Sequence, residues 1–366
     1  MQKTSICCLS HLVWERNLFQ RPQQLMTQFD SLGHRVQYTA MMSFKRWFKA
    51  QPEERKIGFG NHGLAENIPF IPLQKYFPFL NAVNDAKIRR SSEFFFRTAN
   101  HKRILWLQHP AYMRLAKQID HDVLVYDCMD PFRAFNTEQP KLVEHETELL
   151  AKADVVFTGG RSLHSLIEGK NPNMHCLPSG IDFPHFAKGA EAGPLPTDLQ
   201  NVPQPILGYF GAVDERIDWA LVRALCQSHR EWSIVFLGPL IKMAECPIQE
   251  PNFYHLGAKK YDDLPDYLRG FQVALIPWLV NNLTSYMSPT KTPEYLAAGR
   301  PVVSVAIPDV VADYANEAFV ALSTEEFIQH CEKALEQGVS SAEKPIQSRT
   351  WQEIALQMTT QLQELI

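Results

Sequence analysis

The hydrophobic positions of this chain form short apolar runs of strand length that alternate with amphipathic helical stretches. In the first half, the apolar runs at 4–9, 35–40, 104–108, 123–126 and 154–158 are separated by helical patterns. Continuous apolar runs indicate strands buried on both faces, which is typical of parallel sheets. The alternation of strand and helix therefore predicts a doubly wound α/β domain.

A second alternating set begins at residue 205, after a segment rich in Pro, Gly and Ala over 183–205 that we interpret as a linker. Its predicted strands lie at 206–211, 232–237, 273–278 and 301–305. The last segment is amphipathic at helical spacing, with Trp351, Ile354, Ala355, Met358, Leu362 and Ile366 on one face. The chain of 366 residues is long enough for two domains with full cores.

Charge and cysteine content narrow the class of protein. The net charge of −4 gives no electrostatic argument for nucleic-acid binding. The seven cysteines contain no C-x-x-C pair, which favours a reducing compartment over a disulfide framework. The start of the chain has the pattern of a strand rather than of a signal peptide, and no apolar run approaches the roughly 20 residues of a membrane helix. We therefore expect a cytoplasmic protein.

Two segments combine aromatic and basic residues, at 44–49 and 88–97. Such segments can make peripheral contact with the inner face of a membrane or with a lipid-linked acceptor. The alternative is a helix that packs its aromatic side chains inward and leaves its charges in water, and we favour this interpretation because neither segment is long or strongly basic.

The stretch 288–303 carries the densest set of candidate binding residues. Ser288, Thr290 and Thr292 are possible N-caps, Pro289 and Pro293 suit a helix start, and Glu294 falls in the first turn. Lys291 lies beside these positions, so the helix start could bind an anion such as phosphate. A plain helix-to-strand connection, with polar residues acting only as caps, is the alternative.

The sequence of this stretch resembles the donor-site signature of GT-B glycosyltransferases, most closely that of the family 4 retaining enzymes and their bacterial polysaccharide and teichuronic-acid relatives. In that family a Glu within E-A-x-A-x-G-x-P-V-V binds the ribose hydroxyls of a nucleotide sugar. The matching segment here is Glu-Tyr-Leu-Ala-Ala-Gly-Arg-Pro-Val-Val, which begins at Glu294. Many members carry a second Glu eight residues earlier, where this chain has Tyr286.

The resemblance implies an α/β GT-B fold, in which two Rossmann-like doubly wound parallel-sheet domains face a central cleft. It divides the chain into an N-terminal acceptor-side domain over 1–185, a linker over 186–204, a nucleotide-sugar-binding domain over 205–345, and a C-terminal helix over 346–366. In GT-B proteins such a helix packs back on the first domain.

The same resemblance assigns candidate donor contacts. Glu294 would bind the ribose, and Lys291 with Ser288 and Thr290 would meet the diphosphate. Further candidates come from the turn after the first strand of the second domain and from the loop before the signature: Gly211, Arg216, Asn282 and Thr284. Arg216 could equally be a solvated residue at a helix start, and the asparagines of the loop could serve only its turns. No Asp-x-Asp motif stands where a metal-dependent transferase would place one, so we expect no tightly bound metal and no cofactor.

Asp130 and His109 are the candidate catalytic residues, because each follows a predicted strand of the first domain. Either could take or relay the acceptor proton or hydrogen-bond the donor sugar. The alternative for both residues is a structural capping role. Asp127 is a third candidate, for which we favour the structural role. A serine hydrolase is excluded by the lack of a Gly-x-Ser-x-Gly elbow.

The sequence thus predicts a glycosyltransferase that moves a sugar from a nucleotide-diphosphate donor, taken as a UDP-sugar, to a hydroxyl acceptor. The resemblance implies retention of anomeric configuration, independence of metal, and a setting in polysaccharide or glycolipid assembly. Two alternatives stay open: a nucleotide-sugar 2-epimerase, and an inactive protein that binds nucleotide sugars or acts as a scaffold. Fold-level analogy alone does not separate them.

Overall fold

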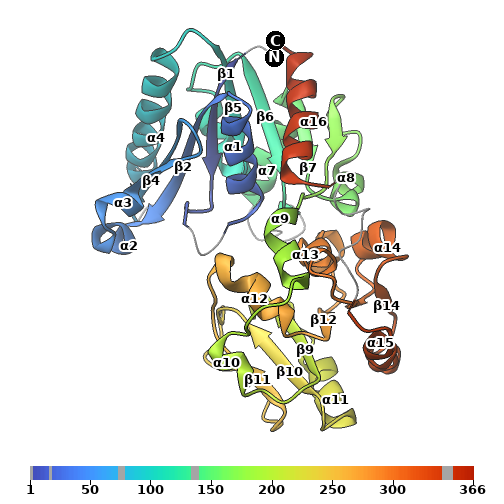
Figure 1. Ribbon diagram of the computed structural model, residues 1–366. Helices are drawn as coiled ribbons and strands as arrows, with labels where there is room; N and C mark the ends of the chain where they lie inside the picture. The colour runs from blue at the N-terminus through green and yellow to red at the C-terminus, as the bar shows by residue number, and fades with distance from the viewer. Residues whose placement is uncertain (1–2, 16–18, 73–78, 133–139, 340–348) are drawn as a thin grey trace. The chain divides into compact units, whose positions relative to one another are not determined.

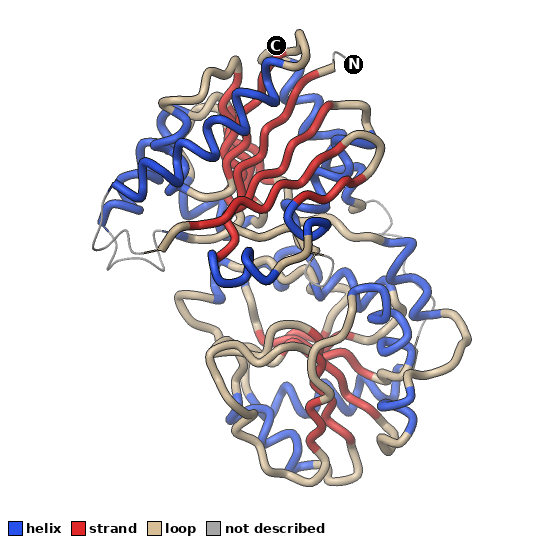
Figure 2. Tube along the Cα trace, turned by 90° about the vertical axis from the view of Figure 1, so that its left-hand side faces the viewer, coloured by secondary structure: helices blue, strands red, loops and turns tan. Residues whose placement is uncertain are grey.

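The computed structural model describes residues 3–15, 19–72, 79–132, 140–339 and 349–366. The chain forms two compact units: Met1–Pro178 with Trp351–Ile366 make the first, and Ser179–Thr350 make the second. In each unit the strands lie between helices on both faces of a sheet, as Figures 1 and 2 show. This is the α/β architecture that the alternation of strands and helices predicts.

The first unit has an eight-stranded sheet in which every neighbouring pair is parallel except β3 against β4. In spatial order its strands are β3 (Lys56–Phe59), β4 (Gly63–Phe70), β2 (Arg35–Ser43), β1 (Thr4–Ser10), β5 (Lys102–Leu107), β6 (Val123–Cys128), β7 (Val155–Thr158) and β8 (Met174–Cys176). β3 and β4 lie in the part of the chain, 41–103, for which the sequence suggested no strands. β4 interrupts its apolar positions with Glu66 and Asn67, so it lacks the continuous apolar run of the central strands.

Alternate side chains of the central strands enter two separate cores, because successive residues of a strand point to opposite faces. Ile6 and Cys8 of β1 pack with α1 (Arg21–Ser31) and α16 (Trp351–Gln363), whereas Cys7 and Leu9 face the opposite core. The helices that supply the opposite core are α4 (Phe79–Arg97), α5 (Met113–Ala116), α7 (Pro140–Lys152) and α8 (Arg161–Ile167). The C-terminal helix therefore belongs to the first unit, although the second unit precedes it in the chain.

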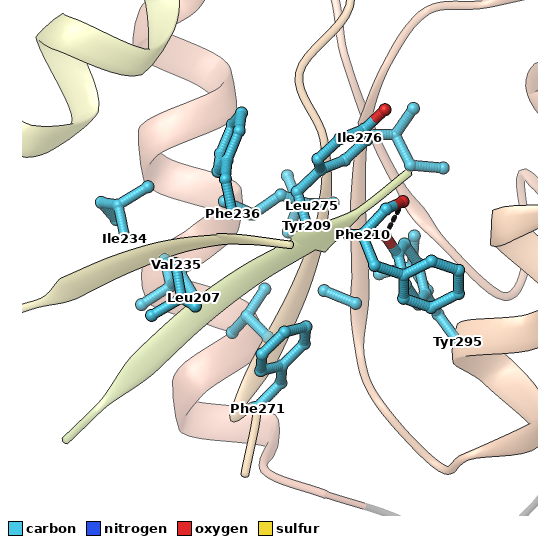
Figure 3. Packing of buried hydrophobic residues seen from close by; sticks show 14 of the residues in the cluster. Leu207, Tyr209, Phe210, Ile234, Val235, Phe236, Phe271, Leu275, Ile276 and Tyr295 are labelled. Carbon is cyan, nitrogen blue, oxygen red and sulfur yellow. Dashed lines mark hydrogen bonds between the residues drawn. The ribbon is translucent and has the colours of Figure 1, made fainter. Parts of the chain in front are cut away.

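The second unit has a six-stranded, all-parallel sheet. Its strands in spatial order are β11 (Phe253–His255), β10 (Ser233–Leu237), β9 (Ile206–Phe210), β12 (Val273–Ile276), β13 (Val302–Val305) and β14 (Phe319–Ala321). Its longer helices are α11 (Trp219–Ser228), α12 (Leu264–Arg269), α13 (Lys291–Ala297), α14 (Pro308–Tyr314) and α15 (Thr324–Gln337). Figure 3 shows the core beside β9, where the Tyr295 hydroxyl accepts a hydrogen bond from the Phe210 amide at 3.0 Å.

The expectation of a linker over 186–204 is wrong, because this segment is built into the second unit. It contains η2 (Ala187–Ala190) and α10 (Thr197–Gln200), and α9 (Phe183–Phe186) precedes it. Phe186 and Leu199 are buried in the core of the second unit. The Arg269 guanidinium donates to the carbonyls of Lys188, Glu191 and Pro194, which fixes the segment against α12. Its Pro and Gly content reflects tight turns rather than a free connection.

The two aromatic and basic segments behave differently. In 88–97, which lies in α4, Ile88, Phe95 and Phe96 are buried, so inward packing is confirmed there, apart from the exposed Phe94. In 44–49, which forms α2 (Phe44–Lys49), inward packing is wrong: Phe44 is 48% and Phe48 is 72% exposed. None of the described helices has the length and apolar character that crossing a membrane requires.

Candidate functional site

The strand order places a topological switch point in the second unit between β9 and β12. From β9 the chain moves outward through β10 to β11, then returns to the other side of β9 as β12 and continues outward to β14. In open α/β sheets, ligands bind beyond the carboxyl ends of the strands at such a point. The residues just after β9 and β12 are Gly211 and Pro277–Trp278. The candidate donor residues can therefore be judged by whether they gather there.

Lys291 and Glu294 both lie in the first turn of α13, and both are half-buried. The Lys291 Nζ lies 5.4 Å from the centre of the Trp278 ring and 5.9 Å from that of Tyr209, which places it at the switch point. Burial lowers the pKa of the Lys291 ammonium and raises the pKa of the Glu294 carboxyl, because each charged form loses hydration. In the part of the chain that the structure describes, neither charge has an ion-pair or hydrogen-bonded side-chain partner. The pair is thus available to a ligand that brings a negative group and hydroxyl donors.

Two glycines keep the space beside Lys291 open. A Cβ on Gly211 would lie 2.2 Å from the Lys291 Cε, and one on Gly238 would lie 1.7 Å from the Gly211 carbonyl oxygen. Their φ angles, +141° and +148°, also favour glycine. The loops that carry them are joined by a hydrogen bond from the Gly211 amide to the Leu237 carbonyl at 2.9 Å. The backbone therefore requires glycine at 211, beside Lys291, and at Gly238, which the sequence pattern did not single out.

Arg216 is held by its own loop rather than left free in water. Its guanidinium forms a two-pronged ion pair with Asp214, with Nε–Oδ1 at 2.8 Å and Nη2–Oδ2 at 2.6 Å, and lies over the Trp278 ring at 5.1 Å. The Arg216 carbonyl accepts from the Leu279 amide at 2.7 Å. Arg216 and Lys291 therefore flank the same indole, and Arg216 joins the loop after β9 to the loop after β12. Part of its charge is neutralised by Asp214, so Lys291 is the stronger candidate for a phosphate contact.

The start of α13 offers fewer free amides than the sequence suggests. The Thr292 amide donates to the Pro289 carbonyl at 3.3 Å, and Pro293 has no N–H group. Ser288 and Thr290 are half-buried, and the hydroxyl of Thr290, the N-cap residue, forms no capping bond. The fully buried Thr292 hydroxyl also has no hydrogen-bond partner among the described residues. Positive charge at this site therefore comes mainly from the Lys291 side chain.

Of the two candidates in the preceding loop, Thr284 has a structural role. It is fully buried, and its hydroxyl donates to the Leu279 carbonyl and accepts from the Asn281 amide. The Asn281 side chain in turn accepts from the Leu283 and Thr284 amides, the pattern of an Asx turn. Its hydroxyl is already used within the loop, which favours a structural role over contact with the donor. Asn282 is exposed at the tip of this loop.

The first unit has its own switch point, between β1 and β5, because β1 is followed by β2 on one side and β5 pairs on the other. His11 follows β1, and His109 follows β5 by two residues. Their ring centres lie 5.1 Å apart, and Phe132 contacts both rings. The structure thus places His109 at this switch point and pairs it with His11, which the sequence reasoning did not select. The available signal was its place directly after the first strand.

Both imidazoles are neutral near pH 7. Burial lowers the pKa of His11 to about 4, and burial with the nearby His11 and Arg114 lowers that of His109 to about 3. The His109 Nδ1 accepts from the Ala111 amide at 3.1 Å, so its Nε2 carries the proton. The capping role is therefore confirmed for His109, and its remaining N–H is a hydrogen-bond donor. Such a group suits contact with a sugar hydroxyl better than removal of a proton.

The end of β6 separates two carboxylates with different roles. Asp127 is buried with Arg21, with their Oδ1 and Nη2 atoms 2.9 Å apart, and it accepts from Gln108 at 2.9 Å, so its structural interpretation is confirmed. Asp130 lies beyond the strand end and is half-buried, and its carbonyl accepts from the Phe132 amide at 2.9 Å. Asp130 thus lies two residues before Phe132, whose ring contacts the two histidines. Among the described residues, no group of three or more His, Cys, Asp or Glu could hold a metal ion.

Comparison with known proteins addresses the family. Residues 204–337 match the glycosyl transferases group 1 family. A Bacillus subtilis (strain 168) protein named as a teichuronic acid biosynthesis glycosyltransferase, TuaH, is 24% identical over 261 residues, which cover 66% of each chain, just under two thirds. The second unit is thus similar to group 1 glycosyltransferases over 204–337, and the TuaH match extends this similarity over 66% of the chain.

Solved structures show the same fold at low sequence identity. A sucrose-phosphate synthase from Thermosynechococcus elongatus gives a TM-score of 0.76 at 13% identity and covers 99% of both chains. An E. coli structure described as trehalose-6-phosphate bound with UDP-2-fluoro glucose gives 0.65 at 13% identity, covering 99% of this chain and 100% of the other. The group 1 match spans all the candidate donor residues of the second unit. The histidine pair of the first unit lies outside that match, so its assignment rests on geometry.

Proposed function

We propose that this protein transfers a sugar from a nucleoside-diphosphate sugar to a hydroxyl acceptor, and that the second unit binds the donor. The observation that carries the proposal is that Lys291, beside Gly211 at the switch point, and Glu294, in the same helical turn, have no ion-pair partner among the described residues. A nucleotide sugar matches this pair, because its ribose hydroxyls can donate to the carboxylate while its diphosphate pairs with the ammonium. The E. coli neighbour with bound UDP-2-fluoro glucose supports a UDP-sugar as the donor.

A binding experiment on Glu294 tests the donor assignment. A thermal-shift panel of UDP, GDP, ADP, TDP and CDP identifies the nucleotide, since a ligand at a hundred times its Kd stabilises by about 2.7 kcal/mol. Glu294→Ala should weaken binding of that nucleotide by about 1–3 kcal/mol, the cost of losing hydrogen bonds to a charged group. Glu336→Ala removes an exposed carboxylate of α15 and is the matched control. Equal affinity in both variants would remove Glu294 from the donor site.

On the acceptor side, we assign Asp130 and His109 to the reacting sugar or the acceptor hydroxyl. Asp130→Asn and His109→Gln should preserve nucleotide binding, because both lie in the first unit, and should lower turnover. Full turnover in one variant would exclude that residue from catalysis. We further propose retention of configuration without a bound metal, in polysaccharide or glycolipid assembly, as the name of the B. subtilis relative suggests. The anomeric proton of the product reports retention directly.

The two alternatives predict different products. A 2-epimerase would convert the nucleotide sugar without any acceptor, and an inactive binder would shift the melting temperature without turnover. The presence of Lys291 at the switch point, with Glu294 in the same turn of α13, favours an active site over a degenerate one. Incubation of the donor with and without acceptor, followed by product analysis, separates all three functions.

Exposed aromatic residues of α2 support peripheral membrane contact as a further part of this proposal. Phe44 and Phe48, one helical turn apart, are exposed beside Lys45 and Lys49. Aromatic groups flanked by lysines bind the interface of anionic bilayers. Phe48→Ser should reduce co-sedimentation with phosphatidylglycerol vesicles, whereas Phe94→Ser, at the other exposed phenylalanine of the two segments, should not. Equal sedimentation of the two variants would exclude α2 as the contact.

A further inference from the structure

A cavity of about 530 Å³ lies in the first unit between α2, α3 (Pro52–Arg55), β4 and α4. These elements are neighbours in Figure 1, and α2, α3 and α4 each contact β4. The size is in the range of cavities that bind small molecules. Its lining residues are Trp47, Pro52, Arg55, Lys56, Glu66, Asn67, Ile68, Pro69, Lys87, Arg90 and Ser91.

The charge of this lining is strongly one-sided. Arg55, Lys56, Lys87 and Arg90 are cations, and Glu66 is the carboxylate of the lining. Glu66 is already used: its Oε1 lies 3.4 Å from the Lys56 Nζ, and its Oε2 accepts from the Ser91 hydroxyl. A neighbouring cavity of about 800 Å³, which shares α2 and α3, has three cations balanced by three carboxylates, namely Lys45, Arg46 and Lys49 against Glu15, Glu53 and Glu54. The excess of positive charge is therefore specific to the smaller cavity.

The cations also retain donors for a ligand. The Arg55 guanidinium stacks on the Trp47 ring at 4.1 Å, and its buried Nε has no partner among the described residues. The exposed Arg90 forms no ion pair in the described chain, and Lys87 has a long contact of 3.5 Å to the Pro69 carbonyl. Arg90 and Lys87 lie three residues apart on α4, so both reach the same side of the helix. Guanidinium and ammonium groups in this arrangement suit a phosphate or a carboxylate.

The rest of the lining suits the uncharged part of a sugar. Pro52, Ile68 and Pro69 supply apolar surface for the C–H face of a ring. Asn67 also lines the cavity. Its Oδ1 accepts a hydrogen bond from the Trp14 backbone amide at 3.1 Å, and its Nδ2 donates to the Glu54 carbonyl at 2.7 Å. It thereby links the cavity wall to the loop that leaves β1 through His11. The cavity and the histidine pair thus belong to the same compact unit and are connected through this loop.

We propose that this cavity binds the anionic group, phosphate or carboxylate, of a charged sugar acceptor. The inference rests on the proposed function, because it assigns the acceptor class of that reaction. It predicts that the protein prefers acidic or phosphorylated sugars over neutral ones of equal size. The preference should fall with salt, since it comes from charge.

The test measures binding of glucose 6-phosphate, glucuronate and glucose to the full chain by calorimetry, with inorganic phosphate as competitor. We expect the charged sugars to bind and phosphate to compete. Arg90→Glu and Arg55→Gln should each weaken charged-sugar binding by about tenfold or more, the scale of losing a hydrogen bond to a charged group. Arg97→Glu makes the same charge change at the exposed end of α4, outside the cavity, and should bind as the unaltered chain does.

UDP binding in every variant separates this inference from the proposed function. Retained UDP binding with equal affinity for glucose and its charged analogues would overturn the cavity assignment and leave the donor site intact. Failure of the unaltered chain to bind any of the five nucleoside diphosphates would instead refute the proposed function. If Arg90→Glu weakens binding only to phosphatidylglycerol vesicles and not to charged sugars, the anion is a lipid phosphate, and the acceptor assignment is wrong.

Discussion

Replacement of Arg21 by alanine should destabilise the first unit strongly without changing substrate affinity. The side chains of Arg21 and Asp127 are 2% and 0% exposed, and the guanidinium also donates to the Leu177 carbonyl at 2.8 Å. The alanine variant leaves the buried Asp127 carboxylate with Gln108 as its side-chain donor among the described residues. Breaking a buried ion pair in this way costs about 3–5 kcal/mol. At about 2–4 °C per kcal/mol for a unit of this size, the melting temperature should fall by roughly 6–20 °C.

Differential scanning calorimetry of Arg21→Ala and Arg103→Ala checks this reasoning. Arg103 also bonds two carboxylates, Asp120 and Asp122, but in a partly exposed position, so its loss should cost about 0–1 kcal/mol. The double variant Arg21→Met with Asp127→Leu should recover most of the stability, because it leaves no buried charge. If Arg21→Ala melts like Arg103→Ala but loses substrate affinity, Arg21 is a substrate contact and the structural interpretation fails.

Three further changes follow from the described geometry. Gly211→Ala should weaken nucleotide binding, because the added Cβ displaces Lys291. Gly257 also has a positive φ, +73°, but a Cβ added there meets nothing within 4 Å, so Gly257→Ala should only lower the stability, by about 1–3 kcal/mol. Equal nucleotide affinity in both variants would contradict the role of Gly211. The free energy of unfolding should decrease as the pH is lowered from 6.5 to about 4. In this range the unfolded chain protonates His11 and His109, whereas the folded chain, in which their pKa values are about 4 and 3, does not. Urea unfolding at several pH values measures this, and a flat profile would contradict it. EDTA should leave transferase activity unchanged. Activity that is lost in EDTA and restored by Mg²⁺ would instead show a metal requirement.

The sequence by itself determined the features that depend on local spacing. Apolar runs and helical periodicity located the central strands of both sheets, because burial on two faces requires an unbroken apolar run. The proximity of Lys291 and Glu294 could also be predicted from the sequence, because residues three apart share one face of a helix whatever surrounds it. The family resemblance of the same stretch then named the class of donor.

Tertiary structure alone decided which distant residues meet. His11 lies beside His109 and Lys291 lies over Gly211 because a crossover brings separate strands together at the centre of each sheet, and strand order is not written in local periodicity. The same holds for polar partners: Thr284 has the residue type of a ligand contact, but its hydroxyl is used within its own loop. A side chain's residue type sets what it can bind, whereas the fold decides whether its hydrogen bonds and charge are still free.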